Sequence, residues 1–202
     1  MGASWPGRST PTAWGWHRLG DAFAEQLVAT SAVRPGDLVL DIGAGDGAVV
    51  GPLLRRGVTV IAVERHPARL AEMRRRFADA GRRLVIVDAD ASDLRLPRRP
   101  FHVVANPPFG VTSALLRRLL QPGSRLVTAH LILQQQVVTH WAGPAAPGAS
   151  RWRRDFEVVA AARLPRAAFR PPPRTDCAVL AVRRRSAPRG RGRYAELRDR
   201  DG

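Results

Sequence analysis

The 202-residue sequence predicts an α/β fold with a mostly parallel, seven-stranded sheet that carries helices on both faces. Short apolar runs of strand length alternate with longer segments of helical periodicity, which is typical of parallel sheets. A glycine-rich turn joins the first apolar run to a helix. Each of the first four runs ends in a polar residue, so we expect these polar groups at the sheet edge where open α/β sheets bind their ligands.

The expected strands follow in order along the chain: 38–42, 58–63, 84–87, 101–105, 125–133, 156–164 and 177–183. The last two strands are expected to close the sheet as a pair. The expected helices are 19–31, 48–56, 67–80, 111–120 and 134–141. Residues 14–185 are therefore predicted to form one domain, between a flexible Gly-, Ser-, Thr- and Pro-rich segment, 1–13, and a basic, disordered tail, 186–202.

Charge is the most unusual property of the composition. The chain has 33 basic and 17 acidic residues, a formal net charge of +16 and a pI near 11.8. Such a charge favours a polyanionic partner such as nucleic acid. A codon bias toward arginine is the alternative explanation. It would account for the use of arginine in place of lysine, but it accounts less well for the excess of basic over acidic residues.

The composition also limits the classes of site and location. A single cysteine, Cys177, excludes an internal disulfide and a cysteine-rich metal site, and we expect no metal. The N-terminus lacks the apolar region of a signal peptide, and no apolar run approaches membrane-spanning length. We therefore expect a soluble cytoplasmic protein that does not contact membranes.

The turn at residues 43–47, GAGDG, follows the first expected strand directly. Glycine lets the backbone approach a ligand closely, and the next helix adds partial positive charge at its N-terminus. The spacing is typical of a nucleoside-type cofactor site in a Rossmann-like unit, although the third glycine comes one residue too early for a dinucleotide fingerprint. Asp41 and Asp46 line this loop and suit a cationic ligand, such as the sulfonium and ammonium groups of S-adenosylmethionine. The alternative is a purely structural glycine turn.

Acidic residues end the next two strands. Glu64, at the end of the second, stands where an acid typically binds a ribose diol. The alternative for Glu64 is a solvated charge at a strand end. After the third strand come Asp88 and Asp90. One of them can accept a hydrogen bond from the adenine amine of a cofactor, and the other can be a turn former.

The fourth strand must end at Asn106, because two prolines follow it and neither can donate to a sheet ladder. The exocyclic amine of adenine is a poor nucleophile, since its lone pair is delocalised into the ring. The side-chain oxygen of Asn106 and the carbonyl of Pro107 could each accept one N–H of that amine and orient its lone pair toward a methyl donor. Phe109 offers a flat face for a splayed-out base. The alternative is a proline-rich turn with a packed aromatic residue.

A segment dense in aromatic and basic groups, WGWHR at 14–18, precedes the first helix. Trp16, His17 and Arg18 either contact nucleic acid or pack this helix onto the domain. The arginines of the third helix have a simpler interpretation as a solvated outer face, and they are Arg69, Arg74, Arg75 and Arg76.

A second segment of this kind, FRPPPR at 169–174, lies between the last two strands. Phe169 either caps the target base from the side opposite Phe109 or packs in the core. Arg170 and Arg174 are candidate RNA contacts. The tail that follows is either an RNA-binding arm or a solubilising appendage.

These motifs together resemble the Erm family of rRNA adenine N6-methyltransferases and, more distantly, the dimethyladenosine transferases of small-subunit rRNA. The matching segments are LDIGAGDG at 40–47, VERHP at 63–67, DADASDLRLP at 88–97, NPPFG at 106–110 and AFRPPPRTDCAVL at 168–180. The resemblance spans roughly residues 14–185. It implies a class I S-adenosylmethionine-dependent methyltransferase fold.

The resemblance also implies roles for individual residues. Asn106, Pro107 and Phe109 would grip the target adenine, and Phe169 matches a later family aromatic. The family aspartate that stands seven residues before a proline fits Asp90, which is therefore preferred to Asp88. The residues implied to bind S-adenosylmethionine are Asp41, Gly43, Ala44, Gly45, Glu64, Arg65, Asp90, Ala91 and Asn106.

Two of the chain's departures from the family pattern bear on cofactor closure and on RNA binding. A Gln-Asn-Phe/Trp-Leu type element usually precedes the first helix, and this chain has WGWHRL at 14–19 instead. Residues 186–202 are too few for the C-terminal helical domain of full-length relatives, so the chain resembles the short actinobacterial members. We then expect RNA to be bound by the basic face of the domain, the N-terminal aromatic segment at 14–18 and the tail.

The resemblance implies methyl transfer to the N6 amine of an adenine in the peptidyl-transferase region of 23S rRNA, conferring macrolide, lincosamide and streptogramin B resistance. The substrate would be protein-free rRNA or an assembling particle, and we expect a monomer that needs no protein partner. The alternatives with the same chemistry are a 16S rRNA adenine dimethyltransferase and a DNA adenine N6-methyltransferase. The alternative from another class is an RNA-binding module without catalytic activity.

Overall fold

The computed structural model describes residues 17–185. The predictions for the flexible segment 1–13, the tail 186–202 and Trp16 lie outside the described residues.

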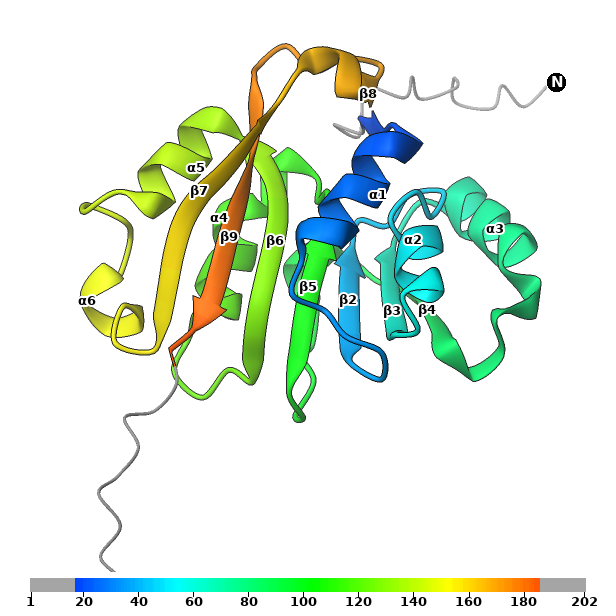
Figure 1. The fold of residues 1–202 in the computed structure, drawn as a ribbon, viewed down its shortest axis with the longest axis horizontal. Coiled ribbons are helices and arrows are strands. Elements are labelled where there is room, and N and C mark those ends of the chain that lie inside the picture. Colours follow the sequence, from blue (N-terminus) through cyan, green and yellow to red (C-terminus); the bar gives the residue numbers. More distant parts are fainter. Residues whose placement is uncertain (1–16, 186–202) are drawn as a thin grey trace, which may run out of the picture.

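A seven-stranded sheet forms the centre of the molecule, in the order β4-β3-β2-β5-β6-β9-β7 (Figure 1). The pairings from β4 to β6 are parallel, whereas β9 pairs antiparallel with both β6 and β7, so β9 alone is reversed in this sheet. The strands are β2 (Leu38–Ile42), β3 (Thr59–Glu64), β4 (Leu84–Asp88), β5 (Phe101–Ala105), β6 (Leu126–Gln134), β7 (Phe156–Leu164) and β9 (Cys177–Arg184). The predicted mostly parallel, seven-stranded sheet is confirmed.

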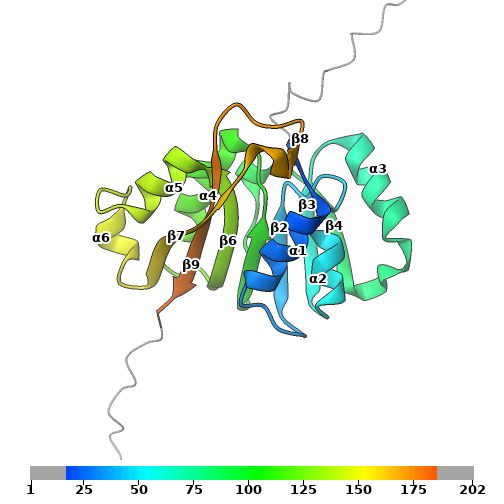
Figure 2. The ribbon, with the colours of Figure 1, turned by 45° about the horizontal axis from the view of Figure 1, so that its top comes forward.

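Helices cover both faces of this sheet, as predicted (Figures 1 and 2). One face carries α1 (Asp21–Thr30), α2 (Val50–Arg55) and α3 (Pro67–Arg76), and the other carries α4 (Thr112–Leu119), α5 (Gln135–Ala142) and α6 (Ala149–Trp152). Alternate residues of each strand serve the two cores. In β2, for example, Leu40 packs on the side of α4 and Val39 on the side of α1. No helix of the described part, 17–185, is long and apolar enough to cross a membrane.

The predicted helix over 19–31 begins later than expected, at Asp21. Arg18–Leu19 instead form a short strand, β1, which pairs antiparallel with β8 (Phe169–Arg170). Leu19 still reaches the core, with 2% of its surface exposed, but it does so from a strand. The pairing partner lies about 150 positions away along the chain, so local periodicity could not reveal it.

The third helix is also shorter than predicted and ends at Arg76. Phe77 leaves the helical conformation, with φ −118° and ψ 31°, and a 3-10 segment, Ala78–Arg83, follows. The Phe77 ring packs so closely under the glycine-rich loop that a Cβ on Gly47 would lie 2.3 Å from it. Phe77 thus ends α3 and packs against the glycine-rich loop.

Candidate functional site

A cavity of about 360 Å³ opens at the carboxyl edge of the parallel strands. The structure brings many of the predicted site residues to it from segments far apart in the sequence. They are His17, Gly43, Glu64, Arg65, Asp90, Ala91, Asn106, Pro107 and Phe109. The predicted meeting of strand-end residues at one sheet edge is confirmed, while their individual roles stay predictions.

Glu64 ends β3 with a carboxylate that is only 7% exposed. Its Oε2 accepts a hydrogen bond from the backbone N–H of Gly45 at 2.9 Å. Its Oε1 accepts from the N–H groups of Arg65 and His66 at 2.9 and 2.8 Å. Because each carboxylate oxygen has two accepting positions, Oε2 keeps one for a further donor on a ligand. Glu64 therefore joins the glycine-rich loop to the start of α3 and presents an acceptor at the cavity.

The backbone N–H groups of the glycine-rich loop are largely used inside the protein. Gly43 and Ala44 both donate to the carbonyl of Val63, at 2.8 and 3.0 Å, and Gly45 donates to Glu64. A phosphate site at a helix N-terminus needs N–H groups that point at the ligand. The loop is therefore poorly suited to a pyrophosphate, in agreement with its departure from the dinucleotide spacing.

Gly43 is required by the close approach of two site segments. Its φ is +75°, in the left-handed region that favours glycine. A Cβ at this position would lie 2.6 Å from Cδ of Pro108 and 3.3 Å from Cα of Pro107. The loop after β2 thus touches the turn after β5, and this contact places the glycine-rich loop and the Asn106 segment around one cavity.

Asp41 lies on a smaller hollow of about 20 Å³, which shares Gly43 and Asn106 with the larger cavity. Its side chain is 1% exposed, and Oδ2 has no hydrogen-bond partner among the described residues. Burial, together with the nearby charges of Glu64 and Asp46, raises the pKa of Asp41 well above its usual value. A buried carboxyl group with an open acceptor fits a cationic ligand group, which would compensate its burial.

Asn106, directly after β5, presents its carboxamide at the cavity. Nδ2 donates to the main-chain carbonyl of His17 over 2.8 Å, while no donor from residues 17–185 bonds to Oδ1. The Phe109 ring stacks on the His17 imidazole, with ring centroids 5.5 Å apart and planes inclined by 29°. His17 Nδ1 lies 2.8 Å from the carbonyl oxygen of Pro171. The site thus combines an open oxygen acceptor with an aromatic surface.

Asp90 lines the cavity, whereas Asp88 is exposed and does not line it. Asp90 Oδ1 accepts from the N–H and the hydroxyl of Ser92, at 2.8 and 2.7 Å, and Oδ2 pairs with Arg65. These bonds, the Ser92 hydroxyl first, lower the pKa of Asp90 and favour the ionised form. The placement agrees with the preference for Asp90. An adenine amine would have to share an oxygen that is already bonded, so this contact stays a prediction.

The interpretation of Arg69 as part of the solvated face of α3 was wrong. Its side chain is 15% exposed, lines the cavity and has Nη1 3.9 Å from Oε1 of Glu64. No local spacing indicated this placement, because Arg65 precedes the extended N-cap residue His66 and so does not share a helical face with Arg69. The other cavity residues that the sequence did not single out are Val63, Ala89, Pro108, Gly110 and Val111.

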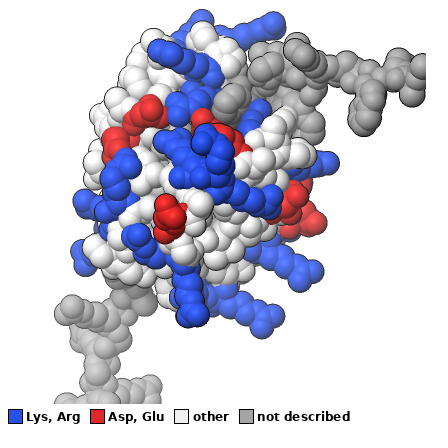
Figure 3. Space-filling view, turned by 90° about the vertical axis from the view of Figure 1, so that its right-hand side faces the viewer, with Lys and Arg blue, Asp and Glu red and all other residues white. Residues whose placement is uncertain are grey.

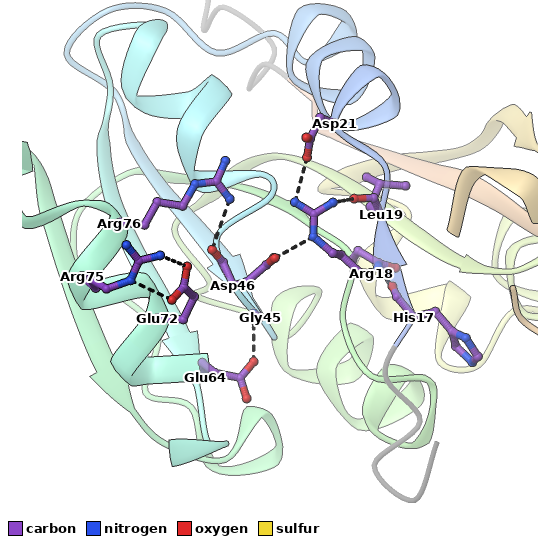
Figure 4. A network of polar contacts seen from close by, with 11 residues as sticks. His17, Arg18, Leu19, Asp21, Gly45, Asp46, Glu64, Glu72, Arg75 and Arg76 are labelled. Carbon is purple, nitrogen blue, oxygen red and sulfur yellow. Dashed lines mark hydrogen bonds and ion pairs between the residues drawn. The ribbon is translucent and has the colours of Figure 1, made fainter. Parts of the chain in front are cut away.

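Four predicted RNA contacts lie away from the cavity or within the protein. Phe169 is 2% exposed and packs in the core beside Leu19, which favours the packing alternative over base capping. Arg18 is half-buried and bonded to Asp46 and Asp21, as Figure 4 shows. Arg170 and Arg174 are exposed, and neither lines the cavity, so their RNA contacts stay predictions. Within residues 17–185, no three acidic, histidine or cysteine side chains are placed to hold a metal ion.

A parallel sheet with a glycine-rich first loop, an acid at the second strand and an open cavity at the carboxyl edge defines a nucleoside-cofactor-binding α/β protein. Residues 21–196 match the family model described as ribosomal RNA adenine dimethylase. The chain belongs to this family, which confirms the resemblance seen in the sequence.

Two curated relatives differ in what their names state, one naming antibiotic resistance and the other methylation of small-subunit rRNA. The mycinamicin-resistance protein MyrB of Micromonospora griseorubida is 34% identical over 192 residues, which cover 89% of this chain and 59% of MyrB. Ribosomal RNA small subunit methyltransferase A of Ralstonia nicotianae is 31% identical over 174 residues, covering 80% of this chain and 60% of the relative. The chain therefore spans about three fifths of the length of each.

Among solved structures, the 23S rRNA methyltransferase ErmE is similar to this chain with a TM-score of 0.74 and 26% identity. The match covers 84% of this chain and 70% of ErmE. A dimethyladenosine transferase from Plasmodium falciparum, at 19% identity and a TM-score of 0.72, shares the fold.

Proposed function

We propose that the chain transfers a methyl group from S-adenosylmethionine to the N6 amine of an adenine in 23S rRNA. The observation that carries this proposal is the open Oδ1 of Asn106 beside the Phe109 ring, in the same cavity as Glu64. The oxygen accepts one N–H of the target amine, and the Pro107 carbonyl accepts the other. The lone pair of the amine is then directed at the methyl donor, which is catalysis by positioning and fixed electrostatics.

The residues of the site fit S-adenosylmethionine, which when bound supplies an electrophilic methyl group. Asp41 is buried, no residue of the described part of the chain pairs with its Oδ2, and a ligand ammonium group would compensate this. Glu64 keeps an accepting position on Oε2 for a ribose hydroxyl, and the remaining cavity wall at Ala91 and Asp90 receives the adenine. The glycine-rich loop offers Gly43 as a close backbone contact. No residue is required as a strong base, because the proton can leave to solvent once the methyl has been transferred.

The surface of the domain supports an RNA substrate. Arginine side chains are spread over the side of the molecule that carries α3 and β4 (Figure 3). Arg65 is 61% exposed and also lines the cavity, so it connects the site with this basic side. The other exposed arginines of this region are Arg74, Arg75, Arg76, Arg82 and Arg83. A phosphate backbone lying along this side would place a flipped base at the cavity.

The choice of 23S rRNA, and with it resistance to macrolides, lincosamides and streptogramin B, is supported by two likenesses. MyrB is named for mycinamicin resistance, and ErmE, with a TM-score of 0.74, is a 23S rRNA methyltransferase. The second candidate is dimethylation of 16S rRNA, which the small-subunit methyltransferase A of Ralstonia nicotianae favours at 31% identity. Both candidates use the same chemistry at Asn106.

The test is transfer of labelled methyl from S-adenosylmethionine to protein-free 23S rRNA, with 16S rRNA and duplex DNA assayed beside it. We expect label at one adenine of 23S rRNA, and its methyl count separates mono- from dimethylation. Label confined to 16S rRNA or to DNA would refute the 23S assignment and leave the chemistry in place. Bound cofactor without transfer to any substrate would refute the enzymatic proposal and favour an RNA-binding module.

A further inference from the structure

Asn106 has two chemically different ends, and only one of them can hold an amine. Oδ1 accepts hydrogen bonds and Nδ2 donates them, so a carboxamide turned over by 180° would present a donor to the target amine. In the structure, Nδ2 donates to the main-chain carbonyl oxygen of His17. Because a carbonyl oxygen accepts and cannot donate, this contact leaves Oδ1 as the free end.

The carbonyl of His17 is useful only if the segment around it is fixed, and tertiary contacts fix it. Immediately after His17, β1 pairs with β8, and the N–H of Gly20 donates to the carbonyl of Ala168 at 2.8 Å. The imidazole of His17 rests on Phe109. Residues 17–20 are therefore held across the site by the segment that contains β8.

Arg18 adds a direct connection between this segment and the glycine-rich loop. Its Nε donates to Oδ2 of Asp46 at 2.6 Å, and Nη2 donates to Oδ1 of Asp21 at 2.8 Å (Figure 4). The Arg18 and Asp46 side chains are only 25% and 23% exposed, so solvent screens this pair less than a surface pair. Burial alone would lower the pKa of Arg18, but the hydrogen bonds to Asp46 and Asp21 outweigh it and raise the pKa.

We propose that Arg18 is a positioning residue for methyl transfer, which holds the His17 carbonyl against Asn106 Nδ2 by pairing with Asp46. Asp46 follows β2 and Asn106 follows β5, and these strands are neighbours in the sheet. Arg18 lines the smaller hollow beside Asp41 but not the larger cavity that holds Phe109, so we place it behind Asn106 and not against the target base. Its catalytic consequence rests on the proposed function, but the contact itself can be measured without any substrate.

Asn106 is the only asparagine in the sequence, which makes it a direct spectroscopic reporter. Selective ¹⁵N labelling of asparagine in the full chain gives one side-chain amide signal with two protons. In the wild type we expect one proton to be shifted downfield and protected from exchange by the His17 carbonyl. In Arg18→Met we expect the shift to collapse and exchange to be roughly fivefold faster, the factor for one lost hydrogen bond. Arg18→Lys should keep much of the protection, because an ammonium can still pair with Asp46.

The matched control is Arg183→Met, which removes an exposed pair with Glu157 on β7 and should leave the Asn106 signal unchanged. An Asn106 signal that is equally shifted and protected in Arg18→Met and in the wild type would overturn the proposal. Thermal unfolding of each variant shows whether a changed signal reflects this contact or a loss of the fold.

Kinetics then test the catalytic consequence. At saturating cofactor and RNA, we expect Arg18→Met to lower kcat roughly tenfold through misplacement of Asn106, with KM for RNA little changed. In an Asn106→Ala background the same substitution should add almost no further loss. A raised KM with unchanged kcat, or equal losses in both backgrounds, would overturn the positioning role. If the wild type methylates no RNA, the proposed function fails, while the amide signal still decides whether Arg18 holds Asn106.

Discussion

The two edges of the parallel sheet both carry buried or half-buried polar side chains, but their hydrogen bonding differs. At the amino edge, His102 Nδ1 lies 2.7 Å from Oγ1 of Thr128, and Nε2 lies 3.4 Å from Oδ2 of Asp37. At the carboxyl edge, Oδ2 of Asp41 and Oδ1 of Asn106 have no hydrogen-bond partner among the described residues. The groups of the amino edge satisfy one another, whereas those of the carboxyl edge keep bonding capacity open.

A polar group that is shielded from water and has no hydrogen-bond partner lowers the stability of the fold. Such a group is therefore expected to serve a function that offsets this cost. Asp41 and Asn106 both line hollows, and the proposed ligands would supply what each lacks, a cation for Asp41 and an amine N–H for Asn106. We therefore expect the polar side chains of the amino edge to stabilise the fold, and Asp41 and Asn106 at the carboxyl edge to bind ligands. Substitutions at the two edges should affect different measurements.

The largest effect is expected at the carboxyl edge, for Asn106→Ala. The variant removes the oxygen that holds the target amine, and we expect kcat to fall on the order of 100-fold or more, as for the loss of one preorganised hydrogen-bonding group. Binding of S-adenosylmethionine, measured by calorimetry, should be nearly unchanged. Transfer at close to the wild-type rate would contradict the proposed mechanism.

For Asp41→Asn we expect opposite effects on ligand binding and on stability. Loss of the negative partner for the cofactor ammonium should weaken cofactor binding by roughly 10- to 100-fold. Without cofactor, the variant should be more stable than the wild type near neutral pH, because the unfolded wild-type chain ionises this carboxyl readily whereas burial opposes its ionisation in the folded state.

The pH dependence of this difference follows from the raised pKa of Asp41, whose causes are burial, then Glu64, then Asp46. The folded state keeps the proton to a higher pH than the unfolded chain, whose carboxyl has a pKa of about 3.9. Wild-type stability is thus unaffected by Asp41 below that pH and falls as pH rises toward the folded pKa. Chemical denaturation from pH 4 to 8 should show the stability gain of Asp41→Asn growing with pH. A stability difference between Asp41→Asn and the wild type that stays constant with pH would contradict a raised pKa of Asp41.

The positions of the main strands and of most cavity residues could be predicted from the sequence, because they depend on local patterns. Two prolines end a strand wherever they stand, and an apolar run before a glycine turn predicts a strand directly. β2 and β5 accordingly have the predicted bounds. The polar residue after each run then lies at the sheet edge by topology alone.

The contacts that orient the site could not be predicted, because they join distant segments. His17 and Pro171 are 154 positions apart, and Asn106 and His17 are 89 apart. No local pattern indicates that β1 pairs with β8, or that Arg18 bonds to Asp46 and so is not free for RNA. The inward placement of Arg69 likewise depends on the attraction of Glu64, which belongs to a different element.

Glu64→Gln tests a residue with both a structural and a ligand-binding role, since Glu64 supports the loops around it and also faces the cavity. A glutamine has one accepting oxygen, so its NH₂ group would face a backbone N–H that Glu64 now accepts from. We expect a loss of about 1–3 kcal/mol in unfolding free energy, together with weaker cofactor binding. Glu72→Gln is the control, because it removes only a pair with Arg75 on the surface of α3, and its unfolding midpoint should be nearly that of the wild type. Equal unfolding midpoints of the two variants would show that Glu64 does not stabilise the fold.

The smallest effect is expected at the amino edge, for Thr128→Val, and it should fall on stability alone. Thr128 is 6% exposed, and the substitution keeps its shape while leaving His102 Nδ1 without its partner. Burial is the main cause of the lowered pKa of His102, so the ring is neutral near pH 7 and the lost bond costs about 1 kcal/mol of unfolding free energy. The matched control, Thr139→Val on the exposed side of α5, should change stability little. Because no group of the amino edge faces the cavity, kcat should stay at the wild-type value in both variants. A loss of kcat in Thr128→Val without a loss of fold would show that the two edges are coupled and not separate in function.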